Sequence, residues 1–402
     1  MNSKRLASTN DCTGCGVCVY SCPRNAIQMF ETEEGFWYPE INPDECIECD
    51  SCNRNCHIMN KNNDANKERT SLYGGFLNDA SERGSVSSGG FATAISKYFI
   101  NKGGVVWGVA YSNDFRCTEY VCIQSLDDIE KLKNSKYAQA SIPDYGKIIN
   151  QIKSNIKVLF IGLPCQCAAL SSVIDKLDNN TISNCTIVSL VCQGQTSAKG
   201  LSIRINELER KYKSKIVSIN MRYKKNGHVR PTCIMYAFEN RKKLIEPFCA
   251  SSIGYYFNYM KRLSCYNCNY KYPNIKADVI IGDFWGWHKS DGIIKGQDNA
   301  GESMIVVLNK KFVNVITELS EEGFTIYPVD WYDLEKKNPS LFRVAIKKNM
   351  KIRELMRKAE SSDEIKSGIP FKKRTCNYLY YYARRILPDS LWNKIKSINK
   401  GE

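Results

Sequence analysis

Apolar runs of strand length alternate with segments of helical periodicity through most of the chain from residue 72 onwards. Short runs rich in Val and Ile between amphipathic stretches are typical of an α/β arrangement. We expect strands at 105–111, 157–162, 186–192, 216–221, 232–238, 279–282 and 304–308. We expect helices at 91–101, 167–177 and 198–212. The pattern therefore predicts an α/β body with a mixed sheet.

The first 59 residues follow a different pattern, which is set by cysteine. One run consists of Cys12, Cys15, Cys18 and Cys22, and a second consists of Cys46, Cys49, Cys52 and Cys56. Both have the spacing C-x2-C-x2-C-x3-C, typical of bacterial ferredoxins, in which the fourth cysteine binds the other cluster. We therefore expect one [4Fe–4S] cluster on Cys12, Cys15, Cys18 and Cys56, and another on Cys46, Cys49, Cys52 and Cys22.

Two other uses of cysteine fit these runs less well. Zinc sites usually take two separated pairs of ligands and often include histidine, which neither run contains. Structural disulfides need an oxidising compartment, and residues 1–10 have no apolar signal segment. Nineteen cysteines in such a chain favour metal sites in a reducing compartment, so we expect a cytoplasmic location.

The chain divides into four segments by composition. We expect a ferredoxin-like α+β module at 1–59, a polar linker at 60–70, the α/β body at 71–345 and a basic, aromatic, helical extension at 346–402. A terminal helix that covers the body is the simpler interpretation of the extension, and peripheral contact with the inner face of the membrane is the alternative. No apolar run has the length of a membrane span.

Two polar motifs in the body are candidates for binding an anion. The segment Ser-Ser-Gly-Gly at 87–90 precedes a predicted helix, where small residues let backbone N–H groups approach a phosphate. The segment Ser-Lys-Tyr-Ala-Gln at 135–139 offers a cation, a ring and an amide. An ordinary loop and a solvated turn are the alternatives.

Four further cysteines predict a third metal site. Cys165 and Cys192 each come at the end of a predicted strand, and ligands of α/β sheets gather at the carboxyl ends of strands. Cys265 and Cys268 form a C-x2-C pair, which brings two thiolates to one metal. On spacing alone, an iron–sulfur cluster, a four-cysteine zinc site and buried free thiols all remain open.

The order of these motifs, followed by Gly-Asp-Phe-Trp-Gly at 282–286, resembles the coenzyme F-420 hydrogenase/dehydrogenase beta-subunit family. The resemblance runs from about residue 11 to residue 345, and Gly-Leu-Pro-Cys-Gln at 162–166 is among its most specific parts. Leu163, Gln193 and Ala140 stand where the family usually has Thr, His and Ser, which leaves the substrate more open than the cofactors. The chain is similar to a bacterial branch found in polysaccharide gene sets.

This resemblance implies an FAD and a third [4Fe–4S] cluster in the body. The implied cluster ligands are Cys165, Cys192, Cys265 and Cys268. The implied flavin contacts are Ser87, Ser88, Gly89, Gly90, Lys136, Tyr137 and Gln139. Asp283 is a candidate for tuning the flavin, with a turn-capping role as the alternative. The three histidines, His57, His228 and His288, lie in no ligand-like spacing and are expected to be structural.

We expect an iron–sulfur flavoprotein oxidoreductase that passes electrons between a hydride-exchanging substrate, coenzyme F-420 or another small molecule, and a redox partner protein. No side chain is required as a catalytic acid or base. Two alternatives are a non-catalytic relay subunit of a larger reductase or dehydrogenase, and a reductase that acts on a sugar intermediate.

The net charge bears on the partner. The chain has 57 Lys and Arg against 42 Asp and Glu, a formal charge of +15. Three cubanes at about −2 each lower this to roughly +9. A basic protein is expected to meet an acidic partner, an anionic coenzyme or an anionic membrane. The sequence has no nucleic-acid-binding motif, and we expect no such partner.

Overall fold

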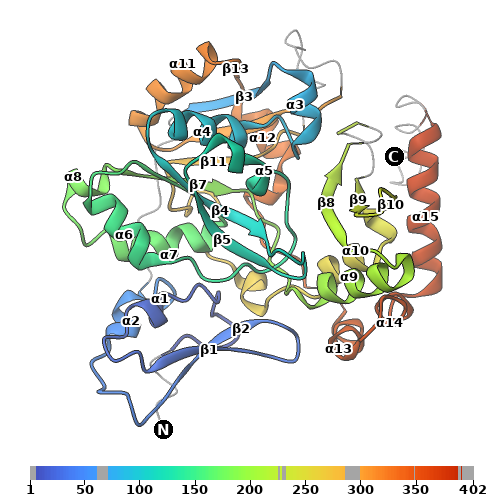
Figure 1. Cartoon of the computed structure of the whole chain (residues 1–402), viewed down its shortest axis with the longest axis horizontal. Coiled ribbons are helices and arrows are strands. Elements are labelled where there is room, and N and C mark those ends of the chain that lie inside the picture. The colour runs from blue at the N-terminus through green and yellow to red at the C-terminus, as the bar shows by residue number, and fades with distance from the viewer. Residues whose placement is uncertain are drawn as a thin grey trace.

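The structure is a computed structural model, and it describes residues 6–60, 71–224, 227–228, 232–285, 299–347, 349–387 and 391. The expected linker at 60–70 lies outside these residues except for Asn60. Figure 1 shows a small N-terminal module, a large central sheet above it and a second, smaller sheet flanked by the C-terminal helix. No described helix is long and apolar enough to cross a membrane.

The N-terminal module is held together by a short hairpin and two short helices. Its strands, β1 (Ile27–Glu31) and β2 (Trp37–Ile41), are antiparallel. Its helices, α1 (Val17–Tyr20) and α2 (Ser51–Asn55), pack against each other. Phe36 and Tyr38 are buried beside Cys12, so the apolar core of the module adjoins its first cysteine run.

The central sheet has eight strands. They are β3 (Ser71–Leu77), β4 (Val105–Tyr111), β5 (Thr118–Ile123), β6 (Val158–Gly162), β7 (Cys185–Leu190), β11 (Val279–Asp283), β12 (Ser303–Val307) and β13 (Phe324–Pro328). Their order across the sheet is β13-β3-β12-β11-β7-β6-β4-β5. The four strands from β11 to β4 are parallel, and the strands outside them pair antiparallel. The predicted α/β body with a mixed sheet is therefore confirmed.

Helices cover both faces of this sheet, because alternate strand residues point to opposite sides. Val106 of β4 packs with α4 (Phe91–Asn101) and α11 (Val313–Glu321), whereas its neighbours Val105 and Trp107 pack with α6 (Tyr145–Lys153) and α7 (Pro164–Ile174). The shorter helices of this part are α3 (Ala80–Ser85), α5 (Ile129–Leu132), α8 (Asn179–Ile182) and α12 (Trp331–Lys337).

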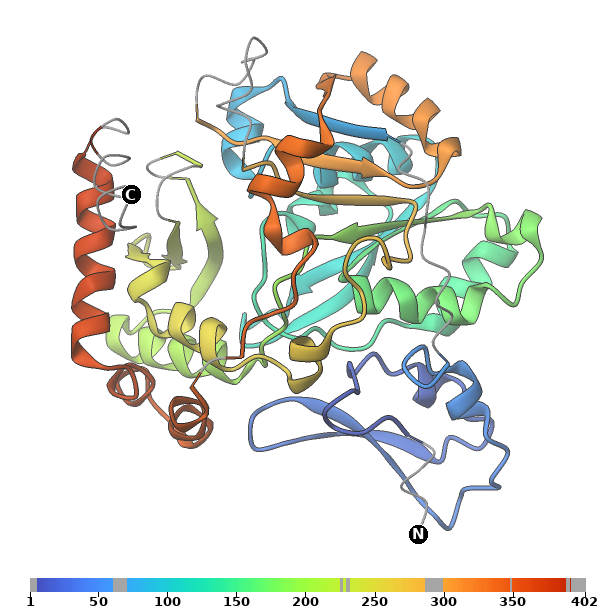
Figure 2. The ribbon, with the colours of Figure 1, turned by 180° about the vertical axis from the view of Figure 1, so that it is seen from behind.

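The smaller sheet stands beside the central one. Its strands β8 (Ile216–Tyr223), β9 (Cys233–Phe238) and β10 (Lys243–Pro247) are antiparallel, and α9 (Lys199–Tyr212) packs on them. A second core joins α10 (Ser252–Tyr259), α13 (Met350–Lys358) and α14 (Ser362–Ser367). The last helix, α15 (Phe371–Ile386), runs along the outer side of this sheet, as Figure 2 shows from behind. Its Tyr381 is buried and Asn377 donates to the Cys249 carbonyl at 2.8 Å, so the extension is docked on the body.

Most predicted elements of the body are present. The helix at 91–101 and the strand at 105–111 have the predicted bounds. The helix expected at 167–177 begins earlier, because Pro164 provides its first turn, and it ends at Ile174. None of the nineteen cysteines forms a disulfide.

Candidate redox centres

The first group of thiols lies in the N-terminal module. Cys12, Cys15, Cys18 and Cys56 line one cavity, as the crossed pairing requires. The loop closes around this cavity because Gly14 and Gly16 adopt positive φ angles of 69° and 76°, which residues with a Cβ rarely adopt. Burial raises the pKa of Cys15 to about 12, and negative charge on Cys12 and Cys56 contributes to the rise. Buried thiolates repel one another in this way unless cations lie between them.

The second group lies farther from the body. Cys22 lies two residues after α1 and Cys52 lies within α2, so the packing of these helices brings the two runs together. Burial raises the pKa of Cys52, and negative charge on Cys46 adds to it. Cys49 is exposed, and hydrogen bonds from the Ser51 backbone and hydroxyl lower its pKa. The second group is therefore the one that solvent reaches.

The body brings its four predicted thiols together. Cys165 lies in the first turn of α7, shortly after β6, and Cys192 follows the neighbouring parallel strand β7. Burial raises the pKa of Cys165 strongly, and the remaining contributions include negative charge on Cys192, Cys268 and Cys265. Backbone N–H groups also point at these sulfurs, with Gly194 3.2 Å from Cys192 Sγ and Gln195 3.3 Å from Cys265 Sγ.

The spacing within these groups is wider than one ion would require. Among the described residues, no three His, Cys, Asp or Glu side chains are placed to hold a single metal ion. Four thiols around one cavity, as in the first group, fit a larger inorganic group that separates its ligands.

The first thiol group of the module adjoins the thiol group of the body. A cavity lined by Cys165, Cys265 and Cys268 is also lined by Thr13 of the module. Burial raises the pKa of Tyr270, and negative charge on Cys165, Cys15, Cys56 and Cys268 adds to the rise. Tyr270 is therefore close to both groups and lies between them.

We call Thr13, His57 and Tyr270 the junction. Thr13 Oγ1 lies 3.3 Å from His57 Nε2, the other ring nitrogen of His57 contacts the Tyr270 hydroxyl, and this hydroxyl donates to the His57 carbonyl at 2.9 Å. Burial lowers the pKa of His57 to about 4, so the ring is neutral near pH 7.

A buried arginine fixes the module on the body. Arg262 is 1% exposed, and its Nε donates to the Cys12 carbonyl at 2.8 Å. Its Nη1 donates to Gln139 Oε1 at 3.1 Å and its Nη2 to the Trp37 carbonyl at 2.8 Å. The guanidinium also lies 4.0 Å from the centre of the Tyr38 ring. Both thiol groups therefore belong to one packed structure.

A cluster of charged and polar side chains lies between the two sheets. Arg222 of β8 donates to Asp283 Oδ2 at 2.9 Å, and His228 Nε2 lies 3.6 Å from Asp283 Oδ1. Burial would raise the pKa of Asp283, but Arg222, His228 and the Ser88 hydroxyl hold it below its usual range. The ring of Trp285 stacks on His228 at 4.9 Å. Together with Ser87, Lys136 and Tyr137, which adjoin them, we call these residues the polar cluster.

The two candidate anion-binding motifs meet in this cluster. The Ser135 N–H donates to Ser87 Oγ at 2.9 Å, which ties the 87–90 loop to the 135–139 segment. Lys224 Nζ donates to the carbonyls of Arg83 and Ser88 at 2.8 and 2.7 Å. Arg222 also hydrogen-bonds Tyr137, whose ring packs 4.7 Å from Phe257.

Lys136 is the buried cation of the 135–139 segment. Its Nζ donates to the carbonyls of Lys133 and Asn134 and lies 5.6 Å from the centre of the Tyr111 ring. Burial lowers its pKa to about 7. The Tyr111 hydroxyl and Asn134 Oδ1 are buried with no hydrogen-bond partner among the described residues. Buried polar atoms usually have a partner, so the Tyr111 hydroxyl and the Lys136 amine fit an anionic organic group bound next to them, and Asn134 Oδ1 fits a hydrogen-bond donor on that group.

Three of the expected flavin contacts have other neighbours. The Gln139 side chain points toward Arg262 and the Trp37 backbone, where the module contacts the body. A Cβ on Gly89 would lie 2.4 Å from the Gly75 carbonyl oxygen, so this glycine allows the loop to pack on the sheet. Gly90 precedes α4 with a φ of 93°.

Sequence reasoning missed several residues of these sites. Arg222 and Lys224 stand in a basic strand end whose only signal was charge, and His228 was expected to be structural although it contacts Asp283. Tyr270 and Arg262 flank the C-x2-C pair but carry no motif of their own. His288 lies outside the described residues.

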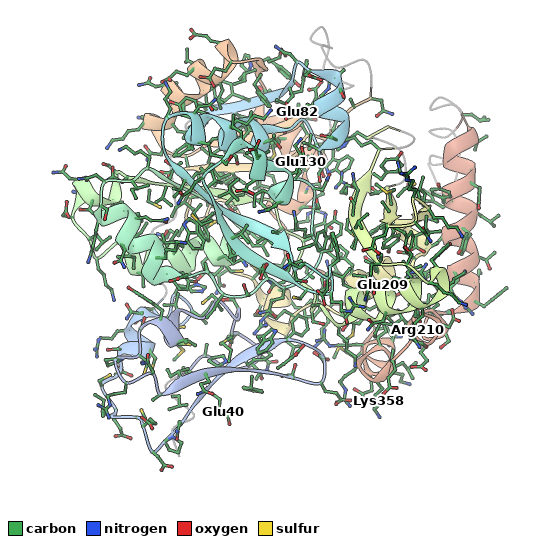
Figure 3. All side chains as sticks on the ribbon, viewed as in Figure 1. Glu40, Glu82, Glu130, Glu209, Arg210 and Lys358 are labelled. Atoms are coloured by element: carbon green, nitrogen blue, oxygen red, sulfur yellow. The ribbon has the colours of Figure 1, made fainter. Side chains whose placement is uncertain are left out.

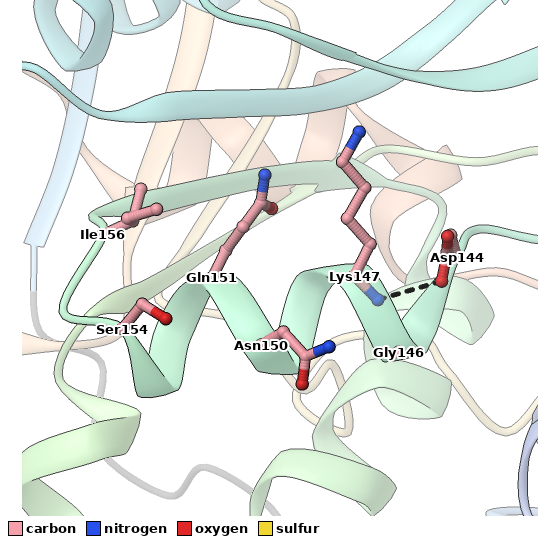
Figure 4. Close-up of a pocket in the computed structure, with 7 residues that line it drawn as sticks. All are labelled: Asp144, Gly146, Lys147, Asn150, Gln151, Ser154 and Ile156. Atoms are coloured by element: carbon pink, nitrogen blue, oxygen red, sulfur yellow. Dashed lines mark hydrogen bonds between the residues drawn. The ribbon is translucent and has the colours of Figure 1, made fainter.

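An open surface groove along α6 is separate from these sites. It is lined by Asp144, Lys147, Gln151 and nearby residues, and Figure 4 shows them on the helix. The Asp144 side chain caps the helix through the Lys147 N–H, and Gln151 accepts from Trp107 Nε1 at 2.8 Å. These contacts serve the helix and the core, and no predicted site residue lines the groove.

Comparison with known proteins places two families on these regions. Residues 11–58 match the family described as "4Fe-4S dicluster domain". Residues 156–327 match the family that describes the C terminus of the beta subunit in coenzyme F420 hydrogenase/dehydrogenase. A chain in the solved F420-reducing [NiFe] hydrogenase complex from Methanosarcina barkeri shares 17% identity, with a TM-score of 0.46 over 75% of this chain and 90% of that one. No curated protein matches.

These matches and the grouped thiols define an iron–sulfur electron-transfer protein with a ferredoxin-like module. Its body carries the C-terminal domain found in beta subunits of the coenzyme F420 hydrogenase/dehydrogenase family, a family of oxidoreductases, so the predicted resemblance is confirmed.

Proposed function

We propose that this chain passes electrons between an organic two-electron substrate and a partner protein, using an FAD and three [4Fe–4S] clusters. The observation that carries the proposal is the junction, where a body thiol group and a module thiol group meet across Tyr270 and His57. Bound FAD supplies exchange of electron pairs with a substrate and of single electrons with a cluster. The expected domain limits of 1–59, 71–345 and 346–402 remain part of this proposal.

The residues of the polar cluster would hold the FAD. Ser87 and Ser88 present hydroxyls, Arg222 presents positive charge, Lys136 presents an amine that is charged below about pH 7, and Asp283 orients Arg222 through their hydrogen bond. The Tyr137 carbonyl accepts from Thr196 Oγ1 at 2.7 Å, and Gln195, next to Thr196, donates to Cys265 Sγ. This segment joins the polar cluster to the body thiols through a few bonds.

The twelve cysteines would hold the clusters in three groups. The groups are Cys12, Cys15, Cys18 and Cys56, then Cys46, Cys49, Cys52 and Cys22, and in the body Cys165, Cys192, Cys265 and Cys268. The absence of disulfides among these residues suits a reducing, cytoplasmic location.

The substrate would be coenzyme F-420 or another hydride-exchanging molecule, with a sugar intermediate as an alternative. Anaerobically purified protein should contain about twelve iron and twelve sulfide ions per chain, because each cubane has four of each, together with one FAD. Single-turnover bleaching of the flavin by reduced F-420 would support the enzyme; flavin without bleaching by any hydride donor would favour a relay subunit. Colourless or zinc-containing protein would contradict the proposal.

A peripheral membrane contact is a second candidate role, and it rests on α15. Its Phe371, Leu379 and Tyr382 are 76%, 63% and 52% exposed, next to Lys372 and other cations. Exposed rings beside positive charge favour an anionic lipid surface. Anionic liposomes should pellet more of the full chain than of a Phe371→Ser/Leu379→Ser variant, and equal pelleting would contradict this role.

A further inference from the structure

Charge is distributed very unevenly between the module and the rest of the chain. Residues 1–60 contain four Lys and Arg against nine Asp and Glu, within a chain whose net charge is +15. The module is therefore acidic on a strongly basic protein. Two clusters at about −2 each make it more acidic still. From the total charge alone, an acidic partner would be expected for any part of the surface, including the module.

The structure also orders the thiol groups of the module relative to the body. Cys15 and Cys56 of the first group lie near Tyr270 and the body thiols. The cavity at the junction is lined by Cys165, Cys265 and Cys268 and by Thr13, which directly follows Cys12 of the first group. The second group is therefore the distal one, and the first stands between it and the body.

The distal group opens to solvent at the outer edge of the module. The loop between β2 and α2 carries Cys46 and Cys49 and lies away from the central sheet in both Figure 1 and Figure 2. Cys49 is exposed, and Ile47 beside it is 59% exposed. An electron leaving the distal group crosses the least protein here.

Acidic side chains surround this exposed point. Asp44, Glu45 and Glu48 are exposed on the same loop, and Glu40 points outward from the end of β2 (Figure 3). The cation Arg54 is also present, and its Nη1 donates to the Cys49 carbonyl at 2.8 Å. We call Glu40, Asp44, Glu45, Ile47, Glu48 and Cys49 the acidic face.

We propose that the acidic face is the docking site of a one-electron redox protein with a basic surface. This inference rests on the proposed function. The transfer moves one electron between the distal cluster and the partner's redox centre, so that one is oxidised and the other reduced, and no bond forms or breaks. An apolar centre with a charged rim is typical of protein interfaces, and redox complexes are small and steered by charge.

The test uses anaerobically purified full-length protein and cytochrome c as a basic probe. A variant with Asp44→Asn, Glu45→Gln and Glu48→Gln neutralises the acidic face. A matched control with Glu119→Gln, Glu239→Gln and Glu321→Gln removes the same charge from exposed positions of the body. Binding is measured with redox-inert zinc-substituted cytochrome c, and electron transfer with the iron form after reduction of the clusters.

We expect the acidic-face variant to bind the probe and reduce it about tenfold more weakly at low ionic strength, with the difference shrinking as salt screens the charges. The control should stay within about twofold of the unmodified chain. An acidic one-electron acceptor of the plant-ferredoxin type should not lose rate with the variant.

Equal losses in the variant and its control, or no loss in either, would overturn the acidic face as the docking site. Iron and sulfide are measured on every sample. A full complement of both with equal losses leaves the proposed function intact and rejects only this docking site. An unmodified chain without clusters rejects both.

Discussion

The two cysteine-bearing regions of this chain are built in different ways. In the module, each run of thiols comes from one loop, and Gly14 and Gly16 with positive φ let that loop turn back on itself. In the body, Cys165 and Cys192 stand at the ends of two adjacent parallel strands, and the other two thiols come from a distant turn. A local spacing is therefore enough for the first site, whereas the second exists only when the sheet has formed.

The two regions also differ in their surroundings. The four body thiols are half-buried, while Cys49 of the module is exposed to solvent. We infer that the body site is sensitive to any change in its four ligands and that the module depends most on how it is anchored. The predictions below test this difference.

The largest effect is expected from Cys268→Ala. Removing one proposed ligand leaves three half-buried thiols with no fourth partner, so the variant should lose about four iron ions while keeping the other eight. Electron transfer from the body to an external acceptor should fall by about a hundredfold or more, because the step through the proposed body cluster would be lost. Iron analysis and low-temperature EPR of the reduced protein measure both.

Cys167→Ala is the matched control for this change. Cys167 is buried on α7 near Cys165, but its sulfur faces the Val188 carbonyl at 3.7 Å. The Cys167→Ala variant should therefore keep all of its iron. Unchanged iron content in Cys268→Ala would exclude Cys268 as a ligand.

Arg262→Ala should weaken the anchoring of the module. Its buried guanidinium satisfies the Cys12 and Trp37 carbonyls and Gln139, and each hydrogen bond to a charged group is worth about 1.5–3 kcal/mol. We expect a loss of about 3 kcal/mol in the free energy of unfolding, measured by urea titration of the holoprotein. The exposed Arg343→Ala should change it by less than about 0.5 kcal/mol. If the two variants unfold alike, Arg262 is not the anchor.

The sequence predicted those parts of the fold and the sites that depend on neighbouring residues. The ferredoxin spacing placed Cys12, Cys15, Cys18 and Cys56 together, and apolar runs located β4 and β6. The strand β5 was missed because its alternation is short: Glu119 is exposed between the buried Thr118 and Tyr120, but the next two residues are both half-buried. Helix α6 offered a signal that went unused, since Asp144 caps it.

Contacts between distant segments were beyond any local pattern. Arg222 and His228 meet Asp283 only because the smaller sheet stands beside the central one. Gln139 follows Tyr137 by two residues, yet its side chain points to Arg262 of another segment. Spacing identifies which residues are candidates, and packing decides which way each one points.

A smaller, pH-dependent effect is expected at Lys136. Burial lowers its pKa to about 7, so the amine gains its proton only as the pH falls through that value. An anionic cofactor should therefore bind more tightly at pH 6 than at pH 8, by about tenfold for one unit of pKa. Equilibrium dialysis of FAD against the apoprotein measures this.

Lys136→Met should bind FAD more weakly and remove the pH dependence, and the exposed Lys131→Met should retain both. The Lys136 amine also affects the free energy of unfolding, but with the opposite dependence on pH. The unfolded chain holds this proton up to a pH of about 10.4, so its contribution to stability rises between about pH 7 and pH 10. A pH-independent affinity in the unmodified chain would argue against Lys136 as an FAD contact.

The smallest effect is expected from Glu33→Gln. Glu33 of the module pairs with Arg357 of α13, but their side chains are 56% and 31% exposed. Exposed ion pairs contribute about 0–1 kcal/mol and are screened by salt. The free energy of unfolding should therefore fall by about 0.5 kcal/mol at low ionic strength, and the difference from the unmodified chain should disappear at high ionic strength. A loss as large as that of Arg262→Ala would mean that surface charge, and not the buried guanidinium, holds the module on the body.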